Sequence, residues 1–300
     1  MIRSLSPADD NFLRALSLIQ ARAERAQRQL ATGLKITQAS DDPDQLSNLM
    51  QARFEIEQLG QIGMNLARVK VEVDTGEQAL QSAVKLIDRA IVLGLQGAGG
   101  TATDQTRSTL AIEVEGILEQ ITNLANSKVE GRYIFSGDSD STAAFSYDPS
   151  DPDNPVGSYQ GTEATRRLLH PAGTTFSVSQ TAEEIFNPSG NSVLNALNEL
   201  RIGLRDNDIA RIDAGAAELR GASTHVNRSL AFYGSVQNRV SDGIEYVNKM
   251  QLRLQAEVAG IQEADITEAI LEFQQAAFHQ QAALSSKGSL PKTSLFDYLG

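Results

Sequence analysis

Apolar residues near the start of the chain recur at alternating spacings of four and three residues. The recurring positions are Phe12, Leu16, Ile19, Ala23, Ala26 and Leu30. This is the a/d rhythm of a coiled-coil helix, in which one apolar stripe runs along one side. Gly33 follows the last of these residues, as glycine commonly does where a helix ends. The pattern predicts a helix over residues 11–32.

A second helix is predicted to begin beside a pair of aspartates. Asp42 can cap it, and Pro43 suits the first helical position, where a missing N–H leaves no bond unmade. The same rhythm then continues to the glycines of segment 97–100, and a shorter run over 110–124 repeats it. The short connection between the two runs predicts an antiparallel hairpin. The apolar positions of the longer run include Ile62, Leu66, Val69, Val73, Leu80 and Ile87.

The longest apolar run lies in the C-terminal third, over residues 212–261. Such a sustained heptad pattern predicts one long coiled-coil helix, and we expect it to pack within the chain against residues 62–87. Its core positions include Val226, Leu230, Tyr233, Val240, Ile244 and Val247. After Asp265 the stripe resumes at Ile266, Ile270, Phe273, Ala277 and Leu284.

Proline separates these helical stretches from a different kind of segment. The eight prolines leave residues 44–148 and 189–290 uninterrupted, and proline in a helix interior costs about 3 kcal/mol. Between about 131 and 190, Gly, Pro, Asp, Ser and Thr punctuate short stretches such as RYIF, RRLLH and TFSVS. These stretches are typical of strands and turns.

The predicted fold is therefore mainly α, with long antiparallel coiled-coil hairpins formed by both chain ends and a small inserted β-rich domain. We predict three parts. Residues 1–42 with 262–300 are terminal helical assembly segments, residues 43–130 with 190–261 form a coiled-coil core domain, and residues 131–189 form the outer insert.

Composition narrows the class of function. The formal net charge is -12, and the excess lies in the middle, because residues 71–200 carry 7 basic and 18 acidic side chains. This charge argues against nucleic-acid binding. The absence of cysteine excludes disulfides and thiolate metal sites. The sequence contains no run of 18 apolar residues, so we predict no membrane span, and the first residues do not resemble a cleavable secretory signal.

Residues that could carry chemistry do not cluster. His170, His225 and His279 lie far apart, and none belongs to a metal-ligand spacing. The acidic segment 148–153 is interrupted by prolines and lacks the closing glutamate of a calcium loop, so a solvated turn is the preferred interpretation. We predict no catalytic, cofactor or metal site, and no enzyme.

Two segments resemble the flagellin superfamily. LATGLKITQASDDPDQLSNL, residues 30–49, is similar to the N-terminal signature of flagellins, in which one helix ends at a glycine and an Asp-Asp pair opens the next. FYGSVQNRVSDGIEYV, residues 232–247, is similar to their C-terminal helix, and IQEADITEA to the segment after it. GRYIFSG at 131–137 and the ending SLFDYLG resemble the hook-associated junction proteins of that superfamily more than filament flagellins.

The resemblance implies a structural subunit of the bacterial flagellum that joins hook to filament. It implies export through the flagellar type III apparatus without a cleaved signal, and partners comprising further copies in a ring, the hook-associated protein on the hook side, filament flagellin and a dedicated export chaperone. It also implies subunit packing through Phe12, Leu16, Ile19, Ala23, Leu30, Ile270, Phe273 and Leu284. The expected chaperone-binding residues are Ile270, Phe273, Leu284 and Phe296.

One close alternative stays open, a compact filament flagellin, which would share every helical feature. A coiled-coil adhesin should carry a cleavable signal or an anchor, and none is visible in the sequence. A hydrolase should offer clustered His, Asp and Ser, and this sequence does not.

Overall fold

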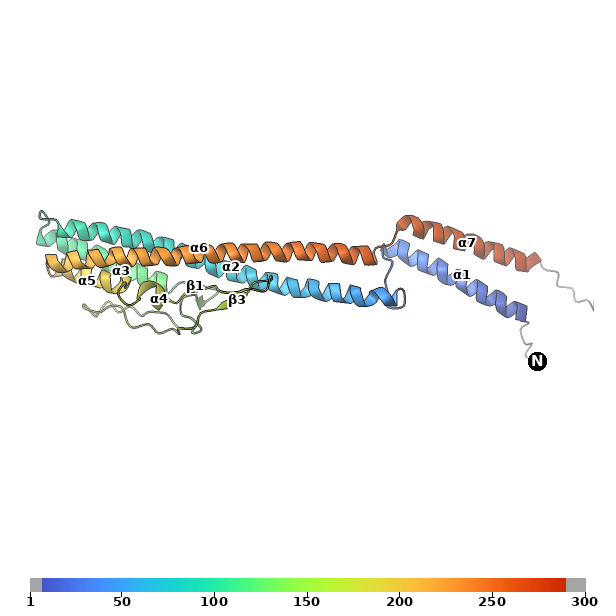
Figure 1. Ribbon diagram of the computed structural model, residues 1–300, viewed down its shortest axis with the longest axis horizontal. Coiled ribbons are helices and arrows are strands. Elements are labelled where there is room, and N and C mark those ends of the chain that lie inside the picture. The colour runs from blue at the N-terminus through green and yellow to red at the C-terminus, as the bar shows by residue number, and fades with distance from the viewer. Residues whose placement is uncertain (1–6, 290–300) are drawn as a thin grey trace, which may run out of the picture. The chain divides into compact units, whose positions relative to one another are not determined.

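The structure, a computed structural model, describes residues 7–289, and most of them are helical (Figure 1). The mainly α prediction is confirmed. The helices are α1 (Pro7–Thr32), α2 (Pro43–Ala98), α3 (Asp104–Ala125), α4 (Ala182–Phe186), α5 (Val193–Arg205), α6 (Ile209–Gln262) and α7 (Ile266–Ser289). The strands are β1 (Lys128–Val129), β2 (Arg132–Tyr133), β3 (Arg167–Leu169) and β4 (Thr175–Ser177).

The end of α1 and the start of α2 lie where the sequence predicts them, whereas α1 begins earlier than predicted, at Pro7, and α3 begins before the predicted run, at Asp104. α1 stops at Gly33, whose φ of 71° lies in the left-handed region that glycine adopts without a steric penalty. α2 begins at Pro43, and the Asp42 side chain accepts a hydrogen bond from the Gln45 amide at 3.2 Å. Each end therefore has a local chemical cause that does not depend on tertiary contacts.

The chain forms two compact units. The terminal unit combines the two chain ends, up to Leu59 and from Met250, and the central unit is Gly60–Lys249. Helices α2 and α6 contribute to both units, and segment 131–189 belongs to the central unit. The three-part functional division drawn from the sequence stays a prediction.

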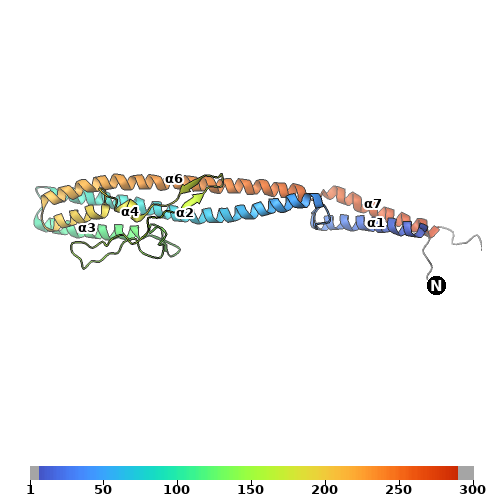
Figure 2. The same ribbon diagram turned by 60° about the horizontal axis from the view of Figure 1, so that its bottom comes forward.

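In the central unit, α2 and α6 lie side by side and run antiparallel (Figures 1 and 2). Glycines on α2 allow the close approach, because a Cβ atom at each of three positions would touch a side chain of α6. From one of these glycines to the next along α2, the number of the α6 residue that faces it falls by almost as much as the glycine number rises. The two antiparallel helices therefore keep one register along this length. The facing pairs are Gly63 with Val247, Gly76 with Tyr233 and Gly94 with Ala216.

The positions predicted to form the intramolecular core lie inside the central unit. Three of the twelve, Ile62, Leu230 and Ile244, are half-buried, and the rest are buried. The buried positions are Leu66, Val69, Val73, Leu80, Ile87, Val226, Tyr233, Val240 and Val247.

The insert contains less β-structure than expected. Two antiparallel ribbons form: β1 pairs with β2 across a turn at Glu130 and Gly131, and β3 pairs with β4. Strands β2, β3 and β4 lie in the predicted stretches, whereas β1 precedes the predicted insert. Both turn residues have positive φ, as a two-residue hairpin turn requires. Most of the remaining insert residues lie in turns and irregular segments.

The insert also supplies part of the core of the central unit. Phe135, Phe145 and Phe186 are among the largest fully buried side chains of the described residues. On the surface, the Glu72 carboxylate of α2 pairs with Arg132 at 3.9 Å and with Arg166. The insert is therefore packed on the helices through both apolar and ionic contacts.

Tyr233 joins the long helices to the insert. Its ring packs edge-on against Phe135, with the centroids 6.0 Å apart, and its hydroxyl accepts a hydrogen bond from the Gln180 amide at 3.3 Å. Tyr233 is 2% exposed. Burial raises the pKa of this hydroxyl, and the Gln180 amide opposes the rise only in part. Tyr233 thus stays neutral and serves as a packing residue.

Arg107, which the sequence pattern did not single out, ties together three helix ends. Its Nε donates to the Gly97 carbonyl at the end of α2 at 2.8 Å, and its Nη1 donates to Asn207, just before α6. Arg107 is buried near the start of α3. A cation at the C-terminus of α2 also opposes the negative end of that helix dipole.

We predict that Gly76→Ala destabilises the central unit by about 1–3 kcal/mol, because its Cβ would lie 2.6 Å from Cε1 of the immobile Tyr233 ring. Gly234→Ala is the matched control, since a Cβ there meets nothing within 4 Å and helix propensity favours alanine by up to about 1 kcal/mol. Denaturant unfolding followed by circular dichroism measures both. Equal stability of the two variants would contradict the close-packing argument.

Candidate assembly surface of the terminal unit

Helices α1 and α7 form an antiparallel pair in the terminal unit (Figures 1 and 2). Near one end, the Lys287 ammonium lies 5.4 Å from the ring centroid of Phe12. Midway, Ile19 and Arg22 of α1 line a cavity of about 70 Å³ together with Ala276 and other residues of α7. The predicted α1 stripe of Phe12, Leu16, Ile19, Ala23 and Leu30 is half-buried.

The face that α7 turns toward α1 differs from the stripe that the large apolar residues predict. Ala269 and Ala276 are 2% and 5% exposed, and they lie one heptad apart on one face of the helix. Ile270, Phe273 and Leu284 are instead 43%, 38% and 51% exposed. The large side chains of α1 therefore meet small ones on α7, and the predicted α7 stripe points outward.

Residues 30–49 and the IQEADITEA segment, both similar to flagellins, meet where α1 ends and α7 begins. The Lys35 amide donates to the Gln262 carbonyl at 2.6 Å, and the Ala264 amide donates to the Gly33 carbonyl at 2.9 Å. Leu34 and Glu263 form an isolated antiparallel bridge between these bonds. Residues more than two hundred positions apart are thus fixed to each other through their backbones.

The side chain of Gln262 strengthens this junction. Its amide nitrogen donates to the Ile36 carbonyl at 3.3 Å, and its oxygen accepts from Arg53 of α2 at 2.8 Å. Gln262 therefore joins the last turn of α6, the loop after α1 and the start of α2. Asp265 then caps α7 by accepting from the amides of Thr267 and Glu268.

Asp41 organises the loop between α1 and α2. Its Oδ2 accepts hydrogen bonds from the Thr37 amide at 3.0 Å, the Thr37 hydroxyl at 2.9 Å and the Gln38 amide at 3.0 Å. The side chain is 6% exposed. Burial alone would raise the pKa of this carboxyl, but the bonds from Thr37 and Gln38 outweigh it and lower the pKa to about 2.

Large apolar side chains on the outer faces of the terminal unit are exposed. Besides the three predicted residues of α7, they occur on all four helices of the unit. They are Leu13 and Leu18 of α1, Met50 and Phe54 of α2, Leu252 of α6, and Ile266, Leu271 and Phe278 of α7. These exposed apolar residues make the terminal unit a candidate binding face. Phe296, a predicted chaperone-binding residue, lies outside the described residues.

Over residues 7–289, no group of three or more His, Asp or Glu side chains could hold a metal ion, and no helix is apolar and long enough to cross a membrane. In the acidic segment 148–153, the carboxylates bind groups of the protein itself. Asp151 accepts from the amides of Asp153 and Asn154, and the Asp153 carboxylate pairs with Arg205. Its carboxylates therefore act as turn and ion-pair partners.

Two family models match the chain. The bacterial flagellin N-terminal helical region matches residues 7–140, and the bacterial flagellin C-terminal helical region matches residues 217–299. Together they cover well over half of the chain, including both segments of the junction at Gly33 and Gln262.

Individual relatives agree with these matches. A flagellar hook-associated protein 3 of Salmonella typhimurium is 31% identical over 172 residues, which make up 56% of this chain and 51% of that protein. The chain thus spans about half the length of that relative. Flagellin FlaB1 of Treponema pallidum is 22% identical over 87% of this chain and 85% of its own length.

One solved structure has a similar fold over most of the chain. It is a candidate flagellar hook-associated protein from Vibrio parahaemolyticus, with a TM-score of 0.66 and 24% identity, covering 74% of this chain and 100% of that chain. At this identity the similarity concerns the fold.

We predict that Asp41→Asn lowers the free energy of unfolding at neutral pH by about 2 kcal/mol. The folded-state pKa of about 2 lies below the ordinary value of 3.8, so the stabilisation is present above pH 3.8 and is lost as the pH falls through 2. The difference between the two proteins should therefore shrink in acid. Denaturant unfolding over a pH series and hydrogen exchange at the Thr37 and Gln38 amides measure it.

The control is Glu24→Gln, which changes an exposed carboxylate of α1 and should alter stability by less than about 0.5 kcal/mol. An Asp41→Asn effect that stayed constant down to pH 2 would mean that the charge of Asp41 is not the cause.

Proposed function

The chain belongs to the bacterial flagellin family, and we propose that it is a structural subunit of the flagellum, in the role of hook-associated protein 3 at the junction of hook and filament. Assembly is supported by the outward apolar stripe of α7, formed by Ile270, Phe273 and Leu284 beside the alanine face that packs on α1. Such a stripe needs a partner outside the chain. The junction role is supported by the 31% identity with the hook-associated protein 3 of Salmonella typhimurium over 172 residues. No catalysed reaction is part of this function.

In the proposed role, identical subunits form a ring that lies between two different proteins. Copies of the chain pack through the terminal unit, the hook-associated protein on the hook side binds one end, and filament flagellin adds beyond the other. In a ring, each copy contacts the next through two different surfaces, as rotational symmetry requires. Exposed apolar residues on all four helices of the terminal unit provide more than one such surface.

The half-buried α1 stripe has a different role from the α7 stripe in this proposal. Ile19 packs within the chain against α7, Leu16 is half-buried on the same stripe, and both contribute to the subunit interface through their exposed edges. Before assembly, the exposed stripe of α7 would need protection. A dedicated export chaperone can cover Ile270, Phe273 and Leu284 as a groove covers an amphipathic helix, with Phe296 as the fourth predicted anchor. The subunit would then leave the cell through the flagellar export apparatus and act outside it.

A compact filament flagellin is the second candidate function. The Treponema pallidum flagellin supports it, because that similarity extends over most of both chains. The two functions differ in where the subunit lies along the flagellum. Immuno-electron microscopy separates them: antibody label confined to the hook–filament junction supports the first, and label along the filament replaces it with the second.

We predict that Leu284→Asp leaves the monomer folded but prevents stable incorporation into flagella. Leu284 is 51% exposed, so the new charge stays in water in the monomer and becomes buried only against a neighbour. Monomer melting should change by at most a few degrees, while cells expressing only the variant should lack attached filaments. Immunoblots of the culture medium verify that the variant is exported.

Ala276→Asp is the matched control on the same helix. Ala276 is 5% exposed and faces α1, so a carboxylate there should loosen the α1–α7 pair within the monomer and speed hydrogen exchange along α1. The proposal for α7 fails if exported Leu284→Asp assembles normally, or if it disturbs α1 as much as Ala276→Asp does.

A further inference from the structure

The tip of one loop in the insert rests on α5 without a single buried side chain of its own. Residues 148–154 are all exposed, and the chain on either side is fixed by a bridge between Tyr147 and Val156. The Asp148 amide donates to the Pro155 carbonyl at 2.7 Å, and Pro155 is buried. The base of the loop is thus anchored, whereas the tip, residues 148–154, is held in place by other contacts.

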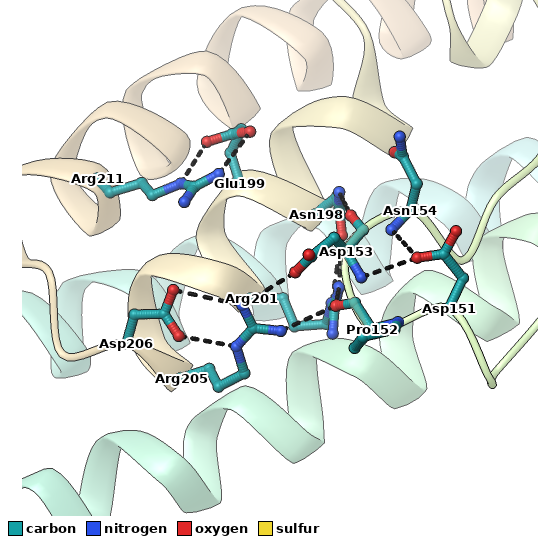
Figure 3. A network of polar contacts seen from close by, with 10 residues as sticks. All are labelled: Asp151, Pro152, Asp153, Asn154, Asn198, Glu199, Arg201, Arg205, Asp206 and Arg211. Atoms are coloured by element: carbon teal, nitrogen blue, oxygen red, sulfur yellow. Dashed lines mark hydrogen bonds and ion pairs between the residues drawn. The ribbon is translucent and has the colours of Figure 1, made fainter.

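Three side chains of α5 hold this tip (Figure 3). Asn198 donates to the Asp153 carbonyl at 2.7 Å, and Arg201 donates to the Pro152 carbonyl at 2.7 Å. Arg205 donates to the same Pro152 carbonyl at 2.9 Å and to the Asp153 carboxylate at 3.1 Å. Every one of these contacts is polar, and they converge on two residues of the loop.

The tip keeps its own shape through separate bonds. Asp151 Oδ1 accepts from the amides of Asp153 and Asn154 at 3.1 and 2.9 Å, and Asp148 Oδ1 accepts from the amide and hydroxyl of Ser150. These bonds lie within the loop and do not involve α5. Contact with α5 holds this turn in place, so release of the tip lets these weak bonds break and exposes its amides to exchange.

The loop also closes a cavity. Residues 154–157 line one side of a space of about 40 Å³, and Phe145 with Leu194, Asn195 and Asn198 line the other. Phe145 and Leu194 are 1% and 4% exposed. Moving the loop would uncover apolar side chains that are buried when it is in place.

We propose that residues 148–154 form a strap that is released from α5 by local opening, without unfolding of the central unit, and that rising ionic strength favours the release. The Arg205–Asp153 pair is 38% and 74% exposed, so dissolved salt weakens it. Arg201 is 5% exposed and is the principal anchor. Net hydrogen-bond contributions are small, and segments held by few apolar contacts open below the free energy of global unfolding.

Hydrogen–deuterium exchange of the full-length monomer, read by mass spectrometry on peptides covering residues 144–158, tests the strap. Arg201→Met removes the donor to Pro152 and should speed exchange of these peptides roughly tenfold, the loss expected for a bond from a charged donor. Peptides from α3 and α6 should keep the exchange of the unaltered protein. Added sodium chloride should speed hydrogen exchange of these peptides in the unaltered protein. It should have a much smaller effect in Arg205→Gln, which lacks the exposed ion pair with Asp153.

Arg211→Gln is the matched control, because it breaks the neighbouring ion pair with Glu199 and touches no residue of the strap. The proposal is overturned if Arg201→Met leaves strap exchange unchanged, or if α5 and α3 lose protection together with the strap. Should Arg201→Met unfold the unit, Arg205→Gln decides: faster exchange confined to residues 144–158 supports the strap, and unchanged exchange at low salt refutes it.

Discussion

Close approach between helices from opposite ends of the chain is the constraint on which the structure depends. In the central unit, glycines of α2 bring it against α6, and the Tyr233 ring fills the space that a side chain at Gly76 would need. In the terminal unit, alanines of α7 play the corresponding part against the larger residues of α1. Small residues facing large ones let helices interdigitate at protein packing density, so each pair has one preferred register.

The α1–α7 packing uses one face of α7 and leaves another face of this helix exposed. Because α7 packs on α1 through alanines, its isoleucine, phenylalanine and leucine side chains remain outside and can serve assembly. The backbone bonds between Lys35 and Gln262 and between Gly33 and Ala264 fix both chain ends at the point where α1 and α7 separate from the other helices. In the proposed assembly, these bonds would hold the apolar faces of α1 and α7 in one relative orientation.

The insert combines two kinds of attachment with different physical properties. Phe135, Phe145 and Phe186 attach it through burial, which salt does not weaken. Arg205 attaches the loop tip through exposed polar groups, which salt does weaken. A segment held in both ways can open at its edge while its root stays in the core.

The sequence alone determined which residues share a helix face and where α1 ends and α2 begins, because both depend on local spacing and capping chemistry. The stop at Gly33, the start at Asp42 and the buried positions from Leu66 to Val247 follow from those rules. The strand stretches at RRLLH and TFSVS also followed, since their composition and flanking turns are local. Two of the segments that carry the flagellin resemblance, residues 30–49 and IQEADITEA, are joined in the structure at Gln262.

Only the tertiary structure decided which face meets which. Periodicity marks Ile270 and Phe273 as a stripe, but the choice of Ala269 and Ala276 as the contact with α1 depends on how two surfaces fit together. The contacts of Arg107 and Arg201 could not be predicted either, because nothing in the sequence around a helical arginine indicates which distant carbonyl it binds. Complementarity belongs to pairs of surfaces, and a one-dimensional pattern describes each surface separately.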